Sequence, residues 1–393
     1  MVEVPFGPDT AKQRTLKVAF IQNRVQRGGR FQVSSEMTRV LNERGIIPDF
    51  LCYRNRIDLA EVQRVYGAHL QLNFVNLHEP TLPFEWNIGW FNTAISKQLS
   101  QYDLVINSNN TSFGLKTKTQ VLSYVHFPRK FRMRSPLRSI HFPEGPMKSW
   151  TDWGNDPFKF LHWAYRWDRS IAENDYQVSN SHHTAGCLQE AYGKSFPDVL
   201  YPPVNEADFP QEFGEGRDPF SVISLGRFSA DKRQLEQIQI AALLPEWRFT
   251  IMGFVNEPKY FAQCEDLVKR LGLKNVALIK DASTQERQQA LQSASFFLHN
   301  LRNEPFGITT VQGIASGCLP IVHNSGGQKE IVPFEDQRFE NVEDAAQKLQ
   351  RWAYHSQEKR AGRMKELQNS LPQYTSQQFR EKFSALLDQL LHP

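Results

Sequence analysis

The amino-acid sequence predicts an α/β protein built from two doubly wound domains. In both halves of the chain, short apolar runs typical of buried strands alternate with helical patterns. The same succession of strand, polar loop and helix begins at "LKVAFI" near the N-terminus and again at "FSVISLG" in mid-chain. A length of 393 residues also suits two domains with ordinary cores.

The first half contains five apolar runs that we expect to be strands: "LKVAFI", "IIPDFLCY", "LVINSN", "VLSYVHF" and "YQVSNS". An amphipathic helix pattern, "FQVSSEMTRVLNERG", follows the first run and stops at Gly45, and "HHTAGCLQEAYG" is a second helix pattern. This alternation predicts a parallel sheet that is covered on both faces.

The second half repeats this pattern with five strand-like runs: "FSVISLG", "RFTIMG", "NVALI", "SFFLHN" and "LPIVHN". A turn-rich stretch, "YPPVNEADFPQEFGEGRDP", separates the two halves. We therefore expect an N-terminal domain over residues 1–205, a C-terminal domain over residues 206–375 and a final amphipathic helix over residues 376–393. Ligands of doubly wound sheets bind at the carboxyl ends of the strands, so a cleft is expected between the domains.

Composition argues against several classes of protein. The chain has no apolar run long enough to span a membrane and no apolar signal segment at its start, so a cytoplasmic protein is expected. A formal net charge of +4 is too small to imply a nucleic-acid partner, although it tolerates an anionic substrate or membrane surface. The cysteines are scattered, which is typical of buried reduced thiols rather than of disulfides or a metal site: Cys52, Cys187, Cys264 and Cys318.

The stretch "NEPFGITTVQGIASG" places an acid just before an expected helix start and an amide within that helix. A helix that begins near Phe306 or Gly307 offers unpaired N–H groups that favour an anion such as phosphate. Glu304 can accept hydrogen bonds from hydroxyl groups there, and Gln312 can lean toward the same cleft. The alternative is a capping acid with a solvated or core glutamine.

Two further stretches carry charge at expected strand ends. Arg227 and Lys232 follow "FSVISL" and can neutralise a departing diphosphate, although charged surface loops are common. His126 ends "VLSYV", where a buried, hydrogen-bonded histidine is the usual alternative. Basic residues interleaved with aromatic ones come next, which suits nucleic acid, an anionic lipid surface, a pyrophosphate-bearing acceptor or a solvated loop: Arg129, Lys130, Arg132, Arg134 and Arg138.

Paired glycines occur at two places. Gly326 and Gly327 form a tight turn that can open a helix on the cleft, and Gly28 and Gly29 follow the first strand without completing a dinucleotide-binding motif. The histidines elsewhere lack the spacing of metal ligands and are interpreted as structural: His162, His182 and His183.

Together these stretches resemble family 4 glycosyltransferases of GT-B architecture, in which two Rossmann-like domains enclose a cleft. The order of the motifs carries the resemblance: "RGGR", "YVHFP", "LYPPVN", "SLGRFSADKRQ" and then "NEPFGITTVQGIASGCLPIVHNSGGQKEIV". Within that family, "YVHFP", "VSNSHHTAGCLQEAYG" and "VLYPPVN" look most like the α-1,2-mannosyltransferases that extend lipid-linked oligosaccharide from GDP-mannose.

The resemblance implies roles in the donor-binding C-terminal domain. Arg227 and Lys232 would bind the diphosphate of a nucleotide sugar, either GDP-mannose or a UDP-sugar. Glu304 would hydrogen-bond the hydroxyls of the donor sugar. The backbone amides at the start of the helix would help to hold sugar and phosphate: Gly307, Ile308 and Thr309.

On the acceptor side, His126 would lie beside the sugar and act with Glu304 as a catalytic residue. Gly28 and Gly29 would form the narrow floor of the cleft, with Arg129 and Lys130 near the acceptor. The resemblance also implies a final helix that crosses back to the first domain, no metal or other cofactor, and retention of configuration. No carboxylate in the chain is an obvious nucleophile, which suits a front-face mechanism.

Gln312 departs from the family motif, which has a second glutamate at this position to bind the nucleotide ribose. A glutamine still forms hydrogen bonds but loses the charge-assisted contact, which is worth about 1 kcal/mol. We therefore expect weakened donor binding or an altered donor rather than an inactive enzyme.

Two other functions stay open. The first is a catalytically silent nucleotide-sugar-binding or scaffold subunit, for which Gln312 is the hint. The second is a nucleotide-sugar epimerase of the same architecture, which "EPFG" disfavours. The acceptor is a glycan, a lipid-linked sugar or a small molecule. Peripheral membrane contact through residues 127–138 and nearby tryptophans is one interpretation of that segment, and a core or cleft-wall role for the tryptophans is the other: Trp150, Trp153, Trp163 and Trp167.

Overall fold

A computed structural model of the protein describes most of the chain. The described residues are 16–26, 28–55, 57–77, 94–109, 115, 117–128, 175–205 and 216–391. Arg129, Lys130, the basic segment that follows them and the four tryptophans of residues 150–167 lie outside this set.

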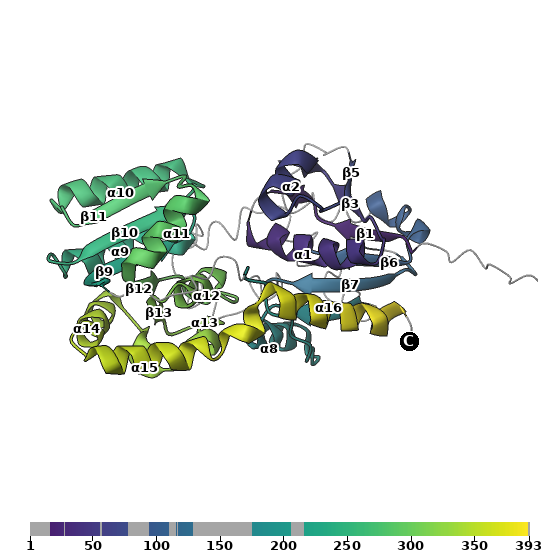
Figure 1. Ribbon diagram of the computed structural model, residues 1–393. Coiled ribbons are helices and arrows are strands. Elements are labelled where there is room, and N and C mark those ends of the chain that lie inside the picture. Colours follow the sequence, from purple (N-terminus) through teal and green to yellow (C-terminus); the bar gives the residue numbers. More distant parts are fainter. Residues whose placement is uncertain are drawn as a thin grey trace, which may run out of the picture.

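Two parallel six-stranded sheets form the two halves of the molecule (Figure 1). The strands of the first sheet are β1 (Val18–Ile21), β3 (Asp49–Cys52), β5 (Asn73–Asn76), β6 (Leu104–Asn107), β7 (Gln120–Val125) and β8 (Asp175–Ser179). Their order in space is β5-β3-β1-β6-β7-β8. The pairing is parallel throughout, with Val18 opposite Leu104 and Phe20 opposite Phe50.

The second sheet repeats this topology. Its strands are β9 (Asp218–Leu225), β10 (Arg248–Gly253), β11 (Val276–Lys280), β12 (Ala294–His299), β13 (Leu319–His323) and β14 (Arg338–Phe339). Their order is β11-β10-β9-β12-β13-β14, so the chain starts in the middle of each sheet, moves to one edge and then crosses to the other. This is the strand order of the Rossmann fold, and it confirms the predicted pair of doubly wound domains.

Two strands of these sheets were not expected from the sequence. β5 is an edge strand whose side chains are exposed or half-buried, and β14 is an edge strand of two residues. Neither presents a continuous apolar run, because an edge strand is shielded less than a central one. A short ribbon of β2 (Arg24–Val25) and β4 (Arg54–Asn55) completes the strands.

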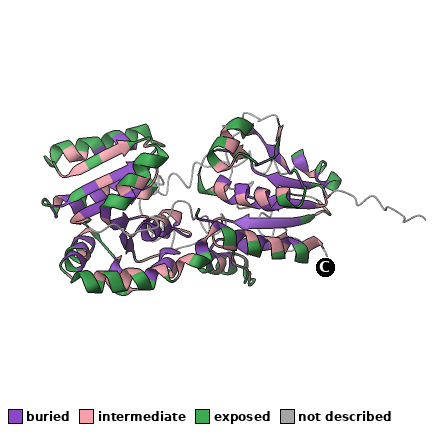
Figure 2. Cartoon of the chain, in the orientation of Figure 1, coloured by how far each residue is buried: buried purple, intermediate pink, exposed green. Residues whose placement is uncertain are grey.

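Helices cover both sheets. The α-helices are α1 (Gly29–Glu43), α2 (Leu59–Tyr66), α8 (His182–Tyr192), α9 (Gln234–Ala242), α10 (Pro258–Arg270), α11 (Thr284–Ser293), α12 (Ile308–Ala315), α13 (Gln328–Ile331), α14 (Val342–Ala353), α15 (Gln357–Gln368) and α16 (Ser376–Leu391). Short 3-10 helices are η1 (Leu99–Gln101), η3 (Ala230–Lys232), η4 (Glu335–Gln337) and η5 (Leu371–Tyr374). The central strands are buried, whereas the edge strands β5 and β11 are exposed or half-buried, and the helices turn their exposed sides outward (Figure 2).

The cysteines are all free and buried: Cys52, Cys187, Cys264 and Cys318. Burial raises the pKa of the Cys52 thiol to about 12. The predicted buried, reduced thiols are confirmed, and a thiol with such a pKa is a poor nucleophile.

The last helix, α16, follows the second domain in sequence but packs on the first (Figure 1). Phe379, Phe383 and Leu387 are buried in the same apolar core as the central strands of the first sheet. Arg44 at the end of α1 forms an ion pair with Asp388 of α16, with 2.6 Å between nitrogen and oxygen. Apolar burial and an ion pair therefore both hold α16 against α1.

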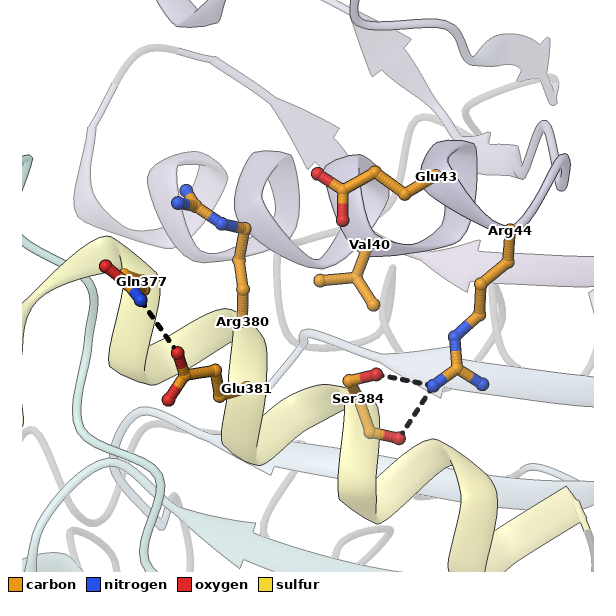
Figure 3. Close-up of a pocket in the computed structure, with 7 residues that line it drawn as sticks. All are labelled: Val40, Glu43, Arg44, Gln377, Arg380, Glu381 and Ser384. Carbon is orange, nitrogen blue, oxygen red and sulfur yellow. Dashed lines mark hydrogen bonds between the residues drawn. The ribbon is translucent and has the colours of Figure 1, made fainter.

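A polar groove runs between α1 and α16 (Figure 3). Its lining residues are Val40, Glu43, Arg44, Gln377, Arg380, Glu381 and Ser384. Arg44 donates a hydrogen bond to the backbone oxygen of Ser384 at 3.0 Å, and Gln377 donates to Glu381 at 2.9 Å. Because Arg44 binds Ser384 of α16 and Arg380 of α16 binds Glu36 of α1 at 2.7 Å, we interpret the groove as a helix–helix seam rather than as a ligand site.

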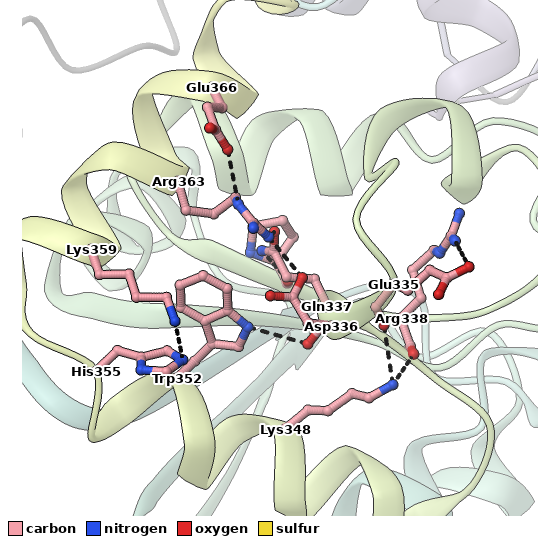
Figure 4. Close-up of polar contacts among 11 residues, drawn as sticks. Glu335, Asp336, Gln337, Arg338, Lys348, Trp352, His355, Lys359, Arg363 and Glu366 are labelled. Carbon is pink, nitrogen blue, oxygen red and sulfur yellow. Dashed lines mark hydrogen bonds and ion pairs between the residues drawn. The ribbon is translucent and has the colours of Figure 1, made fainter.

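The preceding helix, α15, is fixed to the second domain. The Arg363 guanidinium stacks on Phe334 and Trp352, at 3.8 and 4.9 Å from the ring centroids (Figure 4). The same side chain forms ion pairs with Asp336 at 2.7 Å and Glu366 at 3.0 Å. The chain therefore leaves the second domain only after α15.

The two segments that cross between the domains are hydrogen-bonded to each other. Val204 lies on the first crossing and Thr375 on the second, and the two form a parallel β-bridge. The Val204 N–H donates to the Tyr374 carbonyl at 2.8 Å, and the Ser376 N–H donates to the Val204 carbonyl at 3.0 Å. The domains are thus joined by a pair of adjacent segments.

Truncation of Phe383 tests the docking of α16. Phe383→Ala is expected to lower the free energy of unfolding by about 3–5 kcal/mol, because the ring is fully buried in the first core. Urea denaturation followed by circular dichroism measures this change. Lys382→Ala, on the exposed side of the same helix, is the matched control and should change stability by less than about 0.5 kcal/mol. Equal effects of the two variants would contradict the described packing.

Candidate functional site

The candidate site lies at the carboxyl ends of β9 and β12, which are neighbours in the second sheet. The chain runs outward in opposite directions from these two strands, so they mark the switch point at which doubly wound sheets bind ligands. Residues 226–233 follow β9 and residues 300–307 follow β12. The two motifs singled out in the sequence are therefore adjacent in space.

An ion pair joins the two loops across this switch point. The Lys232 ammonium lies 2.7 Å from Oε2 of Glu304, and both side chains are only about 15% exposed. Burial by itself raises the pKa of the Glu304 carboxyl, but Lys232 and His299 outweigh burial and hold that pKa well below its usual range. Glu304 is therefore ionised and presents a fixed hydrogen-bond acceptor.

The second predicted cation is also paired within its own loop. Arg227 forms an ion pair with Asp231, and the Asp231 carboxylate also accepts a hydrogen bond from Ser229. The Arg227 side chain is 39% exposed, so this pair is solvated and weak. An incoming anion such as a diphosphate can therefore compete for Arg227 at little cost.

The backbone on both sides of the ion pair adopts the left-handed conformation. Arg233, directly after Lys232, has φ 58°, and Asn303, directly before Glu304, has φ 53°. Such angles are unfavourable for residues other than glycine, and they concentrate at functional sites. Each of these two residues lies directly beside a charged residue of the pair.

The Gly326–Gly327 turn packs directly on the loop that carries Glu304. A Cβ atom on Gly327 would lie 2.3 Å from the Pro305 carbonyl oxygen, and one on Gly326 would lie 2.5 Å from the Glu304 carbonyl oxygen. The Gly327 N–H donates to that Glu304 carbonyl at 2.7 Å. The two glycines therefore permit a backbone-to-backbone contact that fixes Glu304, and Gly327 also caps α13, as the sequence predicted.

Helix α12 begins directly after this loop. Gly307 is its N-cap, with φ 118°, and the first backbone N–H groups of the helix have no carbonyl partner within it. Ile308 and Thr309 lie on this first turn, and both are half-buried. Gln312 lies deeper in α12 and is half-buried as well. The positive end of α12 therefore lies next to the Lys232–Glu304 pair and favours bound negative charge.

In the first domain, His126 follows β7 at the carboxyl end of its sheet. Its Nε2 lies 3.5 Å from the Ser108 hydroxyl, which follows β6. Burial lowers the pKa of His126 to about 3, and the nearby Arg30 charge acts in the same direction. The ring is therefore neutral at physiological pH and can share a hydrogen bond without bringing a charge.

The glycine loop of the first domain approaches α12 of the second. Gly28 has φ 137°, and a Cβ atom on Gly29 would lie 3.0 Å from Cδ1 of Ile308. The absence of a side chain at Gly29 thus allows close approach of the two domains at the start of α12. The structure brings Gly29 and Ile308 together, as it does Lys232 and Glu304.

A contact that the sequence did not reveal joins the domains beside this site. The Glu330 carboxylate on α13 accepts hydrogen bonds from the backbone N–H groups of His182 and His183, at 3.0 and 2.6 Å, and from the Tyr201 hydroxyl at 3.1 Å. Ser181, the N-cap of α8, donates to the Pro305 carbonyl at 2.5 Å. The N-terminus of α8 therefore binds a carboxylate of the opposite domain. The motif "NSGGQKEIV" contained this acid, but its partners are distant in sequence.

Comparison with known proteins identifies the second half of the chain. Residues 205–366 match the family described as Glycosyl transferases group 1. The mouse protein named GDP-Man:Man(3)GlcNAc(2)-PP-Dol alpha-1,2-mannosyltransferase is 27% identical over 49% of this chain. The Xenopus laevis protein of the same name is 26% identical over 76% of it. The aligned parts span 44% of the mouse protein and 67% of the Xenopus laevis protein.

The fold of the whole chain is also matched by solved structures. Anabaena HepE in complex with UDP and glucose superposes with a TM-score of 0.70 at 15% identity, and the match covers 95% of this chain and 100% of HepE. This likeness establishes the fold and confirms the predicted GT-B architecture. Among the helices of the described residues, none combines the length and apolar character needed to cross a bilayer.

A pair of glycine substitutions tests whether the Gly326–Gly327 turn supports the Glu304 loop. Gly327→Ala is expected to lower the free energy of unfolding by about 1–3 kcal/mol, because its methyl group would overlap the Pro305 carbonyl. Gly362→Ala in the middle of α15 is the control, since its Cβ meets nothing within 4 Å. It should raise stability by about 0.5–1 kcal/mol. Chemical denaturation measures both, and a neutral Gly327→Ala would refute the close contact.

Proposed function

We propose that this protein is a retaining, metal-independent glycosyltransferase that moves a hexose from a nucleotide sugar to an acceptor hydroxyl. The observation that carries the proposal is the Lys232–Glu304 pair at the switch point of the second sheet. It sets a phosphate-binding cation and a hydroxyl-binding carboxylate side by side at the N-terminus of α12. A sugar diphosphate requires both groups at one place.

The donor half of the proposal rests on residues 206–375, and the acceptor half on residues 1–205. The family match over residues 205–366 supports the first assignment. Mannose is the favoured sugar and GDP-mannose the favoured donor, because the mouse and Xenopus laevis relatives carry both in their names. A UDP-sugar is the other candidate, since HepE has the same fold and was solved with UDP and glucose.

In the donor complex, Arg227 and Lys232 bind the diphosphate oxygens. Arg227 is then shared between Asp231 and phosphate, and Lys232 is shared between Glu304 and phosphate. The first N–H groups of α12 add positive charge without a metal ion. Glu304 is ionised, and the Gly326–Gly327 turn fixes its backbone. Its carboxylate accepts hydrogen bonds from the hydroxyls of the sugar.

The proposed transfer is a front-face substitution. The bond between the anomeric carbon and the phosphate oxygen breaks, and its electron pair goes to the diphosphate, where Arg227 and Lys232 neutralise it. The acceptor oxygen forms the new bond to the anomeric carbon on the same face, and its proton passes to the departing phosphate. Neutral His126 hydrogen-bonds the sugar from the first domain. The acceptor is a glycan, a glycolipid or a small molecule.

Gln312 supports a second candidate, a catalytically silent subunit that binds nucleotide sugars. A neutral amide replaces the acid expected at this position, and a charged hydrogen bond to the ribose is lost. The two candidates differ in turnover, because a silent subunit would bind the donor without cleaving it.

Donor binding by the wild type and a Glu304 variant tests the transferase proposal. Thermal unfolding is followed with GDP-mannose, UDP-glucose, GDP and UDP, together with donor hydrolysis. We expect one sugar nucleotide to stabilise the wild type, and Glu304→Ala to weaken its binding roughly tenfold or more by removing a charged acceptor. Binding without hydrolysis or transfer would favour the silent subunit, and no binding at millimolar donor would refute both candidates.

Restoring the acid at position 312 tests the proposed ribose contact. Gln312→Glu is expected to tighten nucleotide binding about five- to tenfold, because a charge-assisted hydrogen bond exceeds a neutral one by about 1 kcal/mol. Isothermal titration with GDP and UDP measures the change. Gln312→Ala should weaken binding, and equal affinities for all three proteins would place the ribose elsewhere.

A further inference from the structure

His299 is a buried histidine that the proposed mechanism does not yet use. It is the last residue of β12, and its side chain is 4% exposed. Its Nε2 lies 3.3 Å from Oε2 of Glu304, and its Nδ1 lies 3.3 Å from the Leu301 backbone nitrogen. The ring therefore bridges the end of the strand and the carboxylate five residues later.

The contacts of His299 determine which ring nitrogen carries the proton. The Leu301 N–H donates to Nδ1, so Nδ1 must be the unprotonated nitrogen. Burial lowers the pKa of His299 although the hydrogen bond to Glu304 opposes this, so the ring is neutral and has one proton. That proton is on Nε2 and is donated to Glu304.

Lys232 and His299 both bind the same oxygen of Glu304. The Lys232 ammonium and the His299 Nε2–H both contact Oε2, at 2.7 and 3.3 Å. Neither of these contacts uses Oε1. The carboxylate is thus held by one oxygen, which leaves the other for a ligand.

We propose that His299 is a positioning residue that holds Glu304 ionised and directs its Oε1 to a hydroxyl of the donor sugar. This inference rests on the proposed function, in which Glu304 binds the sugar and Lys232 binds the diphosphate. Lys232 and His299 both bind Glu304. Once Lys232 is shared with the diphosphate, His299 is the donor that still binds Glu304 alone. A neutral donor suits this task, because it fixes the carboxylate without competing for phosphate.

The charges around Glu304 explain why the histidine matters. Lys232 faces the carboxylate from η3 and His299 faces it from β12, while Asp231 of η3 adds a negative charge near the ring. Burial favours the protonated form of Glu304 and these two donors favour the ionised form. When the diphosphate engages Lys232 and His299 is absent, burial is unopposed and the pKa of Glu304 rises.

Isothermal titration with GDP-mannose and with GDP, from about pH 5.5 to about pH 8.5, tests this role in the protein of 393 residues. The wild type should bind GDP-mannose with little dependence on pH. His299→Phe should bind GDP normally but bind GDP-mannose about tenfold more weakly for each pH unit below the raised pKa of Glu304, because the protonated acid no longer accepts the sugar hydroxyl. His299→Gln keeps an N–H donor near the position of Nε2 and should restore the wild-type profile.

A double variant separates the two roles. In the Glu304→Gln background, His299→Phe should cause no further loss of GDP-mannose binding, because its partner is already neutral. An equal loss of GDP and GDP-mannose binding in His299→Phe would show that the ring only supports the fold and would overturn the inference. An unchanged pH profile in His299→Phe would overturn it as well. If instead Glu304→Gln binds GDP-mannose as well as the wild type does, the proposed role of Glu304 itself fails.

Discussion

The ion pair between Lys232 and Glu304 is the constraint on which the rest of the second domain depends. Two opposite charges are mostly removed from water at 2.7 Å from each other. Such pairs contribute little net stability, because desolvation costs about as much as attraction returns. Around this pair the chain also keeps two left-handed residues and a glycine turn that allows no side chain. An arrangement that gains so little in stability supports the proposal that the pair serves to bind a ligand.

The first domain lies against the candidate site of the second domain. It is held there by hydrogen bonds to a carboxylate and by close packing, rather than by an ion pair. The α8 N-terminus binds the Glu330 carboxylate, and Gly29 lies against Ile308. Both contacts lie next to the loop that carries Glu304, so the proposed donor site and the domain interface share one segment. A change in how the domains meet would therefore act directly on the carboxylate that we propose binds the sugar.

Much of the fold could be predicted from the sequence because central parallel strands are continuous apolar runs. All ten predicted strands exist. The strands β5 and β14 were not predicted, because an edge strand does not need a continuous apolar run. Lys232 and Glu304 were identified because each belongs to a local motif at a strand end. His299 and Glu330 were not identified, because a histidine at the end of "FFLH" and an acid in "QKEI" belong to no distinctive sequence pattern. Their partners become visible only when loops from separate strands are brought together.

The hydrogen-bonded crossing segments have a mechanical consequence. A single flexible linker would let one domain swivel in any direction about the other. Here Val204 and Thr375 run side by side, and the helix after the second crossing is locked into the first core. Twist or sideways slip of one domain against the other would have to break the two hydrogen bonds of this bridge. The domains are therefore tied to each other at two adjacent points rather than through one free linker.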